Sequence, residues 1–132
     1  MDINDLKYNP DLANNGVWVE HDETTSFLIA KLGNKGFQTA FKKRLQPYRR
    51  AYENGTLSAK KEVEIMVECM ADHILLGWKG LLLNGKEIQY SREKCVEILS
   101  MEGAEEFRDL ITNYSTDVAN YKTEQNELDL KN

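Results

Sequence analysis

Histidine, cysteine and proline are scarce in this sequence, which contains two residues of each type. So few histidines and cysteines exclude a disulfide framework and leave little from which to build a metal or catalytic site. Long hydrophobic runs are also missing. The longest apolar stretches, residues 74–78 and 81–83, fall far short of the ~20 residues that span a bilayer. The first residues show no basic region followed by an apolar one, so we expect a protein that is not exported and whose cysteines are reduced thiols.

An overall excess of basic residues, the usual footprint of a nucleic-acid-binding protein, is absent as well. The chain has 17 lysines and arginines against 22 aspartates and glutamates, which gives a net charge of -5. With 132 residues, 41% hydrophobic and 30% charged, the composition is that of one globular domain, residues 1–132. Within it we predict a loose N-terminal lead-in at residues 1–15 and a frayed polar tail at residues 124–132.

The charges are unevenly distributed along the chain. Residues 35–50 carry six bases and no acid, whereas the rest of the chain is acidic on balance. These bases could pair with acidic helices of the same chain or with an acidic partner, and we favour internal pairing. Glu64, Glu68 and Asp72 follow one another at four-residue steps, which predicts an acidic helical stripe. That stripe is either a solvated face or the surface that answers the bases.

Hydrophobic spacing and turn residues predict the secondary structure. Residues 16–20 and 26–32 are rich in β-branched and aromatic side chains and are joined by a polar link, which predicts a β-hairpin. Apolar residues recur every three or four positions in four further segments: residues 34–54, 58–76, 91–99 and from 103 or 104 to about 121. The predicted fold class is therefore mostly α (α+β), with an N-terminal β-hairpin packed on a bundle of about four helices.

Single residues mark where these helices begin and end. Pro47 lies inside the first helical pattern and must either kink that helix or start a second one. Ser58 and Ser91 are predicted N-caps. Residues 77–80 are predicted to end the central helix, with Trp78 packed back on the core. Asn84-Gly85 then predicts a tight turn, within a small hairpin or an irregular wrap.

No catalytic motif and no glycine-rich phosphate loop is present, so we expect neither an enzyme nor a cofactor. The best metal-ligand candidates are Cys69 and His73, which are four residues apart and thus on one helical face. Cys95 and His21 would complete a Cys2His2 set. Ligands that come singly from distant elements fit no compact zinc motif, so we interpret the cysteines as core residues and predict no metal site.

The basic segment interleaves bases with aromatic residues, as a surface that stacks nucleic-acid bases would. The aromatics keep helical spacing, which is also the pattern of an amphipathic helix with a basic outer face. Because the rest of the chain is acidic, we keep a small nucleic-acid-binding regulator as an alternative function only. The residues concerned are Phe37, Phe41, Tyr48 and Tyr52 among Lys42, Lys43, Arg44, Arg49 and Arg50.

The order of these features resembles that of a known family. A Trp-bearing hairpin comes first, with GVWV at residues 16–19, followed by a basic aromatic helix and a helix that begins at a serine. The most distinctive part is residues 77–91, GWKGLLLNGKEIQYS. It resembles the Trp-x-Gly, hydrophobic, Asn/Asp-Gly-Lys and Tyr/Phe-Ser/Thr segment that precedes a helix in tail assembly chaperones of long-tailed bacteriophages. The likeness covers residues 16–111.

This resemblance implies a non-enzymatic protein that acts in the cytoplasm of the bacterial host and is not retained in the mature virion. Such chaperones coat the long helical tape measure protein before tail-tube subunits polymerise around it, and many have a longer frameshifted form that recruits the major tail (tube) protein. We therefore expect binding to the tape measure protein, self-association along this elongated partner, and no membrane or nucleic-acid partner. The family motif fixes no binding surface. We place it on the basic helix or on the last helix, at Lys42, Lys43, Arg49, Arg50, Tyr114, Val118 and Tyr121.

Overall fold

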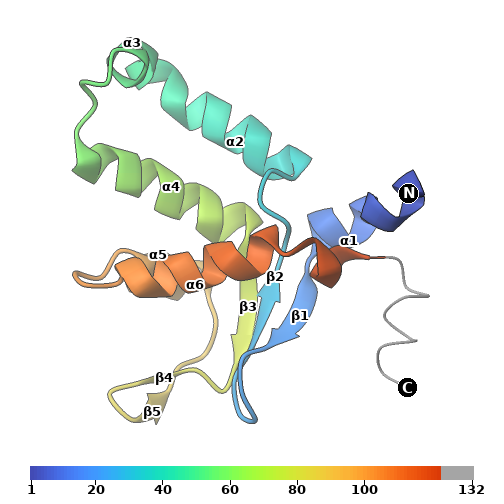
Figure 1. The fold of residues 1–132 in the computed structure, drawn as a ribbon. Helices are drawn as coiled ribbons and strands as arrows, with labels where there is room; N and C mark the ends of the chain where they lie inside the picture. Colours follow the sequence, from blue (N-terminus) through green and yellow to red (C-terminus); the bar gives the residue numbers. More distant parts are fainter. Residues whose placement is uncertain (123–132) are drawn as a thin grey trace.

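A computed structural model describes residues 1–122 of the chain and shows a single mixed α and β domain, so the predicted fold class is confirmed (Figure 1). The structure has short 3₁₀ helices (η), α-helices and two small sheets. In chain order these are η1 (Ile3–Leu6), α1 (Pro10–Asn15), β1 (Val17–Glu20), β2 (Ser26–Ile29), α2 (Lys35–Leu45), η2 (Gln46–Tyr48), α3 (Arg49–Glu53), α4 (Ala59–His73), β3 (Leu75–Lys79), β4 (Leu82–Leu83), β5 (Lys86–Glu87), α5 (Arg92–Leu99), α6 (Glu105–Thr116) and η3 (Val118–Tyr121).

The main sheet has three antiparallel strands in the order β1-β2-β3. The predicted hairpin forms β1 and β2, with Val19 opposite Phe27. The third strand corrects the prediction that residues 77–80 only end the central helix. Helix α4 already ends at His73, and Trp78 lies opposite Phe27 in β3. A short apolar run of this kind can be a buried strand or a buried helical turn, and periodicity alone does not separate the two.

Close approach of the chain at two turns depends on unusual backbone angles. Gly80 follows β3 with a φ of 73°, and a Cβ there would overlap the carbonyl of Thr24 in the hairpin loop. Asn84 and Gly85, with φ values of 54° and 80°, form the tight turn between β4 and β5. Positive φ at both central residues is what a two-residue type I′ hairpin requires. The predicted small hairpin is therefore confirmed.

Helices α2, α4 and α5 begin at polar caps, as the sequence predicts for two of them. Ser58 accepts a hydrogen bond from the N–H of Lys61, and Ser91 accepts one from the N–H of Lys94. Asn34 caps α2 and is buried. Its side-chain oxygen accepts from the N–H of Phe37, and its amide nitrogen donates to the carbonyls of Lys31 and His73. This one side chain therefore joins the end of the sheet, the start of α2 and the end of α4.

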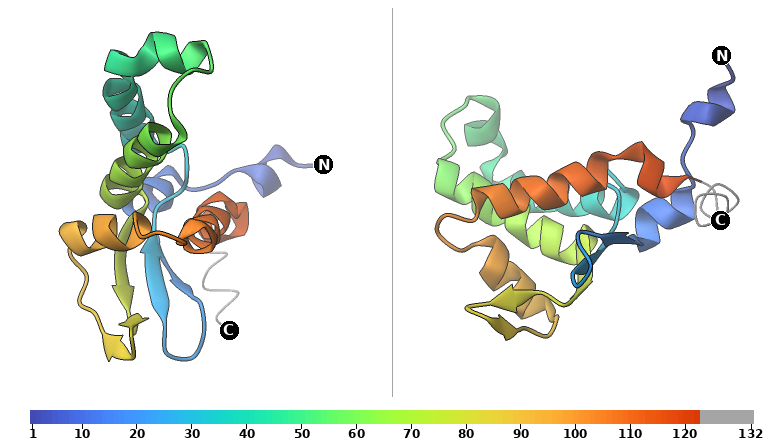
Figure 2. Two further views of the ribbon diagram at one scale, coloured as in Figure 1. Left: turned by 90° about the vertical axis from the view of Figure 1, so that its left-hand side faces the viewer. Right: turned by 60° about the horizontal axis from the view of Figure 1, so that its bottom comes forward.

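Pro47 interrupts the first long helical pattern. Because proline lacks an N–H and crowds the preceding turn, α2 stops at Leu45, a 3₁₀ turn follows, and the chain continues in a new direction as α3. Helices α2, α3 and α4 together project from the sheet, and we call residues 35–73 the helical arm (Figure 1). Helices α5 and α6 lie on either side of the sheet-proximal end of α4 (Figure 2).

The core lies where α4, the sheet, α5 and α6 meet. Its fully buried residues come from each of these elements and include Phe27, Ile29, Cys69, Leu75, Cys95, Leu99 and Ile111. Trp78 is 6% exposed, donates its indole N–H to the carbonyl of Ile88 over 2.8 Å, and meets the ring of Tyr90 edge-on. The prediction that Trp78 packs on the core is thus confirmed.

Residues 1–15, the predicted lead-in, include η1 and α1. Helix α1 is tied into the fold because Ala13 is buried and its carbonyl accepts from the N–H of Lys31. The N–H of Asn9 donates to the carbonyl of Tyr121, so the start of the chain packs beside η3. The predicted polar tail, residues 124–132, lies outside the described residues. None of the helices within residues 1–122 combines the length and hydrophobicity needed to cross a bilayer.

Candidate partner-binding site

A continuous hollow runs along one side of α2. One part has a volume of about 810 Å³ and lies between α2 and Met66 of α4. A second part, of about 610 Å³, lies in the bend that Pro47 makes between α2 and α3. Both parts share Thr39, Lys42 and Leu45, so they form one surface, which we call the α2 groove. Its apolar and aromatic lining residues are Leu32, Phe37, Phe41, Leu45, Tyr52 and Met66.

Stacked aromatic rings form the floor of the α2 groove. Phe37 and Phe41 are four residues apart, and their rings are nearly parallel, with centroids 5.9 Å apart. Tyr52 of α3 meets Phe41 edge-on at 6.5 Å. Phe37 is buried against the core, Phe41 is half-buried, and Tyr52 is 44% exposed. Exposure therefore increases along the groove, and apolar surface that the described residues leave uncovered lies at its outer end.

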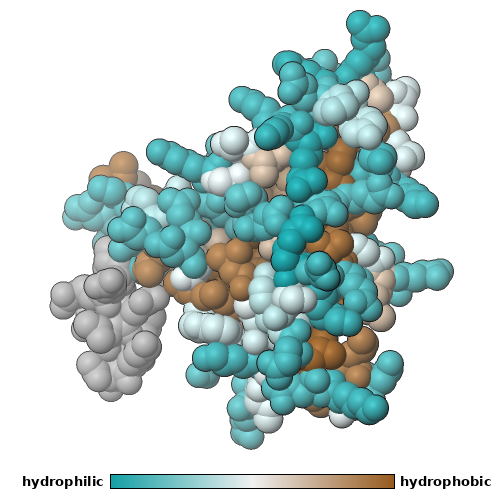
Figure 3. All heavy atoms as spheres, turned by 180° about the vertical axis from the view of Figure 1, so that it is seen from behind, coloured by the Kyte–Doolittle hydropathy of each residue, from teal (hydrophilic) through white to brown (hydrophobic). Residues whose placement is uncertain are grey.

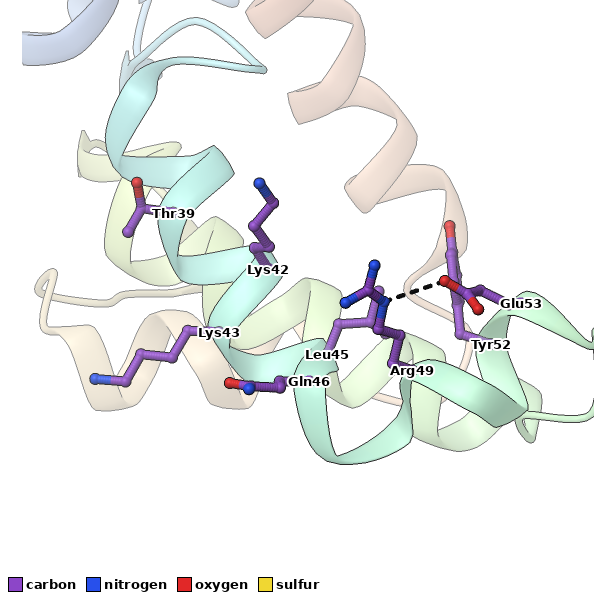
Figure 4. A pocket seen from close by; sticks show the side chains of 8 residues that line it. All are labelled: Thr39, Lys42, Lys43, Leu45, Gln46, Arg49, Tyr52 and Glu53. Atoms are coloured by element: carbon purple, nitrogen blue, oxygen red, sulfur yellow. Dashed lines mark hydrogen bonds and ion pairs between the residues drawn. The ribbon is translucent and has the colours of Figure 1, made fainter.

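Cations stand along the rim of the α2 groove. Lys42, Arg49 and Tyr52 point to the same side of the arm, whereas Lys43 points away from them (Figure 4). Arg49 pairs with Glu53 one turn later, at 3.1 Å. Within residues 1–122, no ion pair involves Lys42 or Lys43. The rim thus carries positive charge that the described chain does not neutralise.

The opposite side of α2 is closed by an ion-pair network. Arg44 lies 3.3 Å from Asp72 and 3.8 Å from Glu68 of α4, and Arg92 of α5 bonds the same two carboxylates. The hydrogen bonds from Arg92 lower the pKa of Asp72 below its ordinary value. The acidic stripe therefore does pair with the basic segment, but Arg44 is the one base of residues 35–50 that takes part. Glu64 instead pairs with Lys61 of its own helix.

The end of α6, the other predicted binding surface, is used inside the fold. Tyr121 is fully buried and donates its hydroxyl hydrogen to the carbonyl of Ile29 over 3.0 Å; its burial raises its pKa. Tyr114 is half-buried, and its hydroxyl shares a 2.8 Å hydrogen bond with Nδ1 of His21. Val118 is exposed. The predicted helix to about residue 121 is too long, because α6 ends at Thr116 and the turn into η3 carries Tyr121 into the core. Binding of a partner by Tyr114, Val118 and Tyr121 stays a prediction.

The candidate metal ligands do not meet. Cys69 and Cys95 are buried free thiols, and burial raises the pKa of the Cys95 thiol to about 12, so the metal-binding thiolate form is disfavoured. Across residues 1–122, no three His, Cys, Asp or Glu side chains form a cluster that could hold a metal ion.

Apolar side chains are also exposed elsewhere. Met1, Ile3, Leu6 and Tyr8 lie together on and beside η1, and the others lie on separate elements. Trp18 of β1 lies under the ammonium of Lys79 at 4.2 Å, and Leu82 lies on the small β4–β5 hairpin. Seen from behind, the surface is mostly hydrophilic, with hydrophobic side chains in separate patches (Figure 3). Single exposed apolar residues are normal on protein surfaces. The α2 groove differs because its apolar residues line one hollow.

Part of the α2 groove was not among the predicted binding residues. The structure brings together Lys42, Lys43 and Arg49 from that prediction, and leaves Arg50 outside the lining. Leu32 and Met66 were not predicted to line a site, although Met66 belongs to the apolar stripe assigned to the central helix. The sequence signal that could have indicated Met66 is the width of the apolar stripe on α4, which is greater than one neighbouring helix can cover.

Comparison with protein-family models places the chain among proteins of phage origin. Residues 32–132 match the model described as YdaY prophage protein, and this match covers more than half of the chain. The protein therefore belongs to the YdaY prophage protein family. No curated protein and no solved structure has significant similarity to the chain. The matched residues begin at Leu32 and so include the whole α2 groove.

Proposed function

We propose that this prophage-family protein is a non-enzymatic tail assembly chaperone that binds the phage tape measure protein. The observation that carries the proposal is the α2 groove, an apolar hollow along a helix that the described residues leave open. Amphipathic helices bind proteins by laying their apolar side into such a groove. The phage origin of the family and the resemblance of residues 16–111 to tail assembly chaperones support the same function.

The proposed mechanism is protection of apolar surface. A long helical tape measure protein exposes apolar stripes, and large exposed apolar patches cause aggregation. A small protein that covers one stretch of stripe per copy, with many copies along one chain, gains avidity from repetition. The protein would act in the host cytoplasm, self-associate along its partner, bring in the major tail (tube) protein and leave before the virion is complete. It needs no cofactor for any of these steps.

The test is the mass of the purified protein by light scattering, alone and after co-expression with a long helical tape measure protein of the same prophage. We expect a soluble complex with several copies per long chain, where the long chain alone is insoluble. Leu45→Asp, which places a charge in the groove, should abolish the complex. Val63→Asp is the matched control, because Val63 is 37% exposed and does not line the α2 groove. A long protein that stays insoluble in the presence of the wild type would refute the function.

A nucleic-acid-binding regulator remains the second candidate, because Lys42, Lys43 and Arg50 are exposed and form no ion pair within residues 1–122. The burial of Phe37, which is stacked on Phe41, argues against it, because it leaves mainly the exposed rings of Tyr48 and Tyr52 for stacking on bases. Binding to DNA that weakens steeply with salt, and is lost when these three bases become Gln, would favour the regulator.

A further inference from the structure

We propose that the α2 groove takes one amphipathic helix of another protein, and that this helix carries acidic side chains on the flank that lies against Lys42 and Arg49. The inference rests on the proposed function only in assuming that the partner is another protein. It adds the length of the partner helix and the sign of the charge on its flank.

The dimensions of the groove suit a helix of about three turns. Helix α2 has 11 residues, which is roughly 16 Å at 1.5 Å per residue. Phe37, Phe41 and Leu45 recur every four residues along it, and Met66 of α4 lies opposite. A partner helix presents apolar side chains at i, i+3 or i+4, and i+7 over the same length. These anchors would fill the spaces between the groove residues.

The charge of the rim decides which helix fits. Residues 35–50 contain no acid, and Arg44 is already neutralised by Glu68 and Asp72 on the far side of α2. Within residues 1–122 Lys42 has no such partner, so pairing with an incoming carboxylate would break none of the ion pairs described. Arg49 already forms an ion pair with Glu53 and should contribute less to binding of the acidic flank. A basic flank would be repelled at the same place, and this repulsion selects against basic helices.

A second copy of this chain offers no suitable helix among its described residues. The apolar side of α4 is packed into the core, and that of α6 covers the sheet through Phe107 and Ile111. The occupant to which we commit is therefore a helix from a different protein.

The test uses the full-length protein and two synthetic helical peptides of about 18 residues, roughly 27 Å long, that share one leucine stripe. One peptide has Glu along both flanks and the other has Lys. Fluorescence anisotropy should show binding of the Glu peptide that weakens with salt, and at least about tenfold weaker binding of the Lys peptide.

Four variants then locate the contact, each checked for an unchanged circular dichroism spectrum. Lys42→Glu should weaken binding of the Glu peptide about tenfold, whereas Lys42→Arg should retain it. Arg50→Glu makes the same charge change outside the groove lining and should leave the affinity unchanged. Leu45→Asp should abolish binding of the peptide.

Three results would overturn the inference. The Lys peptide could bind as tightly as the Glu peptide, which would show that the charge of the rim does not select the partner. Arg50→Glu could weaken binding as much as Lys42→Glu, which would show attraction by net charge alone. The groove could also be taken by this chain itself. If a second copy occupies the groove, the mass of the protein in solution would rise with concentration and Leu45→Asp would lower it. If residues of the same chain occupy it, replacing Leu128 and Leu130 with Ser would strengthen binding of the peptide.

The two proposals fail separately. If the long helical protein is kept soluble but Lys42→Glu has no effect on that complex or on the peptide, the inference is wrong and the chaperone function stands. If the acidic peptide binds as expected while the long protein stays insoluble, the groove is correctly assigned and the chaperone function is wrong.

Discussion

Helices α2 and α6 both present aromatic and aliphatic side chains every three or four residues, but the fold covers these two stripes to different extents. On α6, Phe107 meets Phe27 of the sheet edge-on at 6.0 Å, and Ile111 is fully buried. On α2, Phe37 is buried, whereas Phe41 and Leu45 remain half-exposed along a hollow.

The difference comes from what each helix can pack against. Helix α6 lies on β2, and a sheet offers a broad face that accepts a whole stripe. Helix α2 packs mainly on α4, and a helix offers only a narrow ridge. The ion pairs of Arg44 hold α2 to one side of that ridge. The same amphipathic pattern therefore builds a core in one region and leaves a groove in the other.

The largest expected effect tests the covered region. Tyr121→Ala removes a fully buried ring and its hydrogen bond to Ile29, and should lower the free energy of unfolding by about 3–5 kcal/mol in urea titrations. Tyr121→Phe keeps the ring and should lower it by only about 1 kcal/mol. A loss below about 1 kcal/mol for the alanine variant would mean that η3 does not close the core.

A second prediction concerns two weak acids, the buried Cys95 thiol and the half-buried Tyr90 hydroxyl. Burial raises the pKa of both the Cys95 thiol and the Tyr90 hydroxyl to about 12, from ordinary values of 9.0 and 10.0. The unfolded chain loses these protons first, so their contribution to stability is complete below pH 9 and declines as the pH rises toward 12. We expect a loss of roughly 1–3 kcal/mol between pH 8.5 and 11, measured by urea unfolding. Cys95→Ala should make the free energy of unfolding depend less on pH. An equally steep decline in that variant would mean that other groups cause the pH dependence.

A third, smaller effect tests the ion pairs that hold α2 to one side. Asp72→Asn should lower the free energy of unfolding by about 1 kcal/mol at pH 7, a value that allows for partial exposure of the carboxylate. Because the pKa of Asp72 is lowered from 3.8, its stabilisation is present above that pH and is lost as the pH falls further. The difference between wild type and variant should thus shrink at pH 3. Glu64→Gln, in a pair within one helix, should change stability little at either pH.

Local features of this fold could be predicted from sequence because they depend on few residues. The caps at Ser58 and Ser91 and the turn at Asn84-Gly85 each follow from one or two side chains and the backbone beside them. The hairpin of β1 and β2 was equally predictable, since both strands and their link are adjacent in the sequence.

Features that depend on distant segments could not be predicted. Residues 75–79 join the sheet because β2 offers them an edge, and their apolar run does not reveal this. Tyr121 and Tyr52 are both aromatic residues at helical spacing, yet only the first is buried. Which of them is buried depends on whether another element of the fold lies over it, and single-helix periodicity contains no such information.

The smallest expected change in stability tests the open region directly. Tyr52 forms the outer wall of the α2 groove and is 44% exposed, so Tyr52→Ala should lower the free energy of unfolding by less than about 1 kcal/mol, mainly through its edge contact with Phe41. It should nevertheless weaken binding of the Glu-flanked peptide severalfold in anisotropy. Tyr48→Ala is the control, because Tyr48 is exposed beside Lys61 and lies outside the lining. A variant that loses much stability would show that the α2 stripe is covered as fully as that of α6. A variant that stays stable and loses the peptide would show that α2, unlike α6, keeps its apolar stripe for a partner.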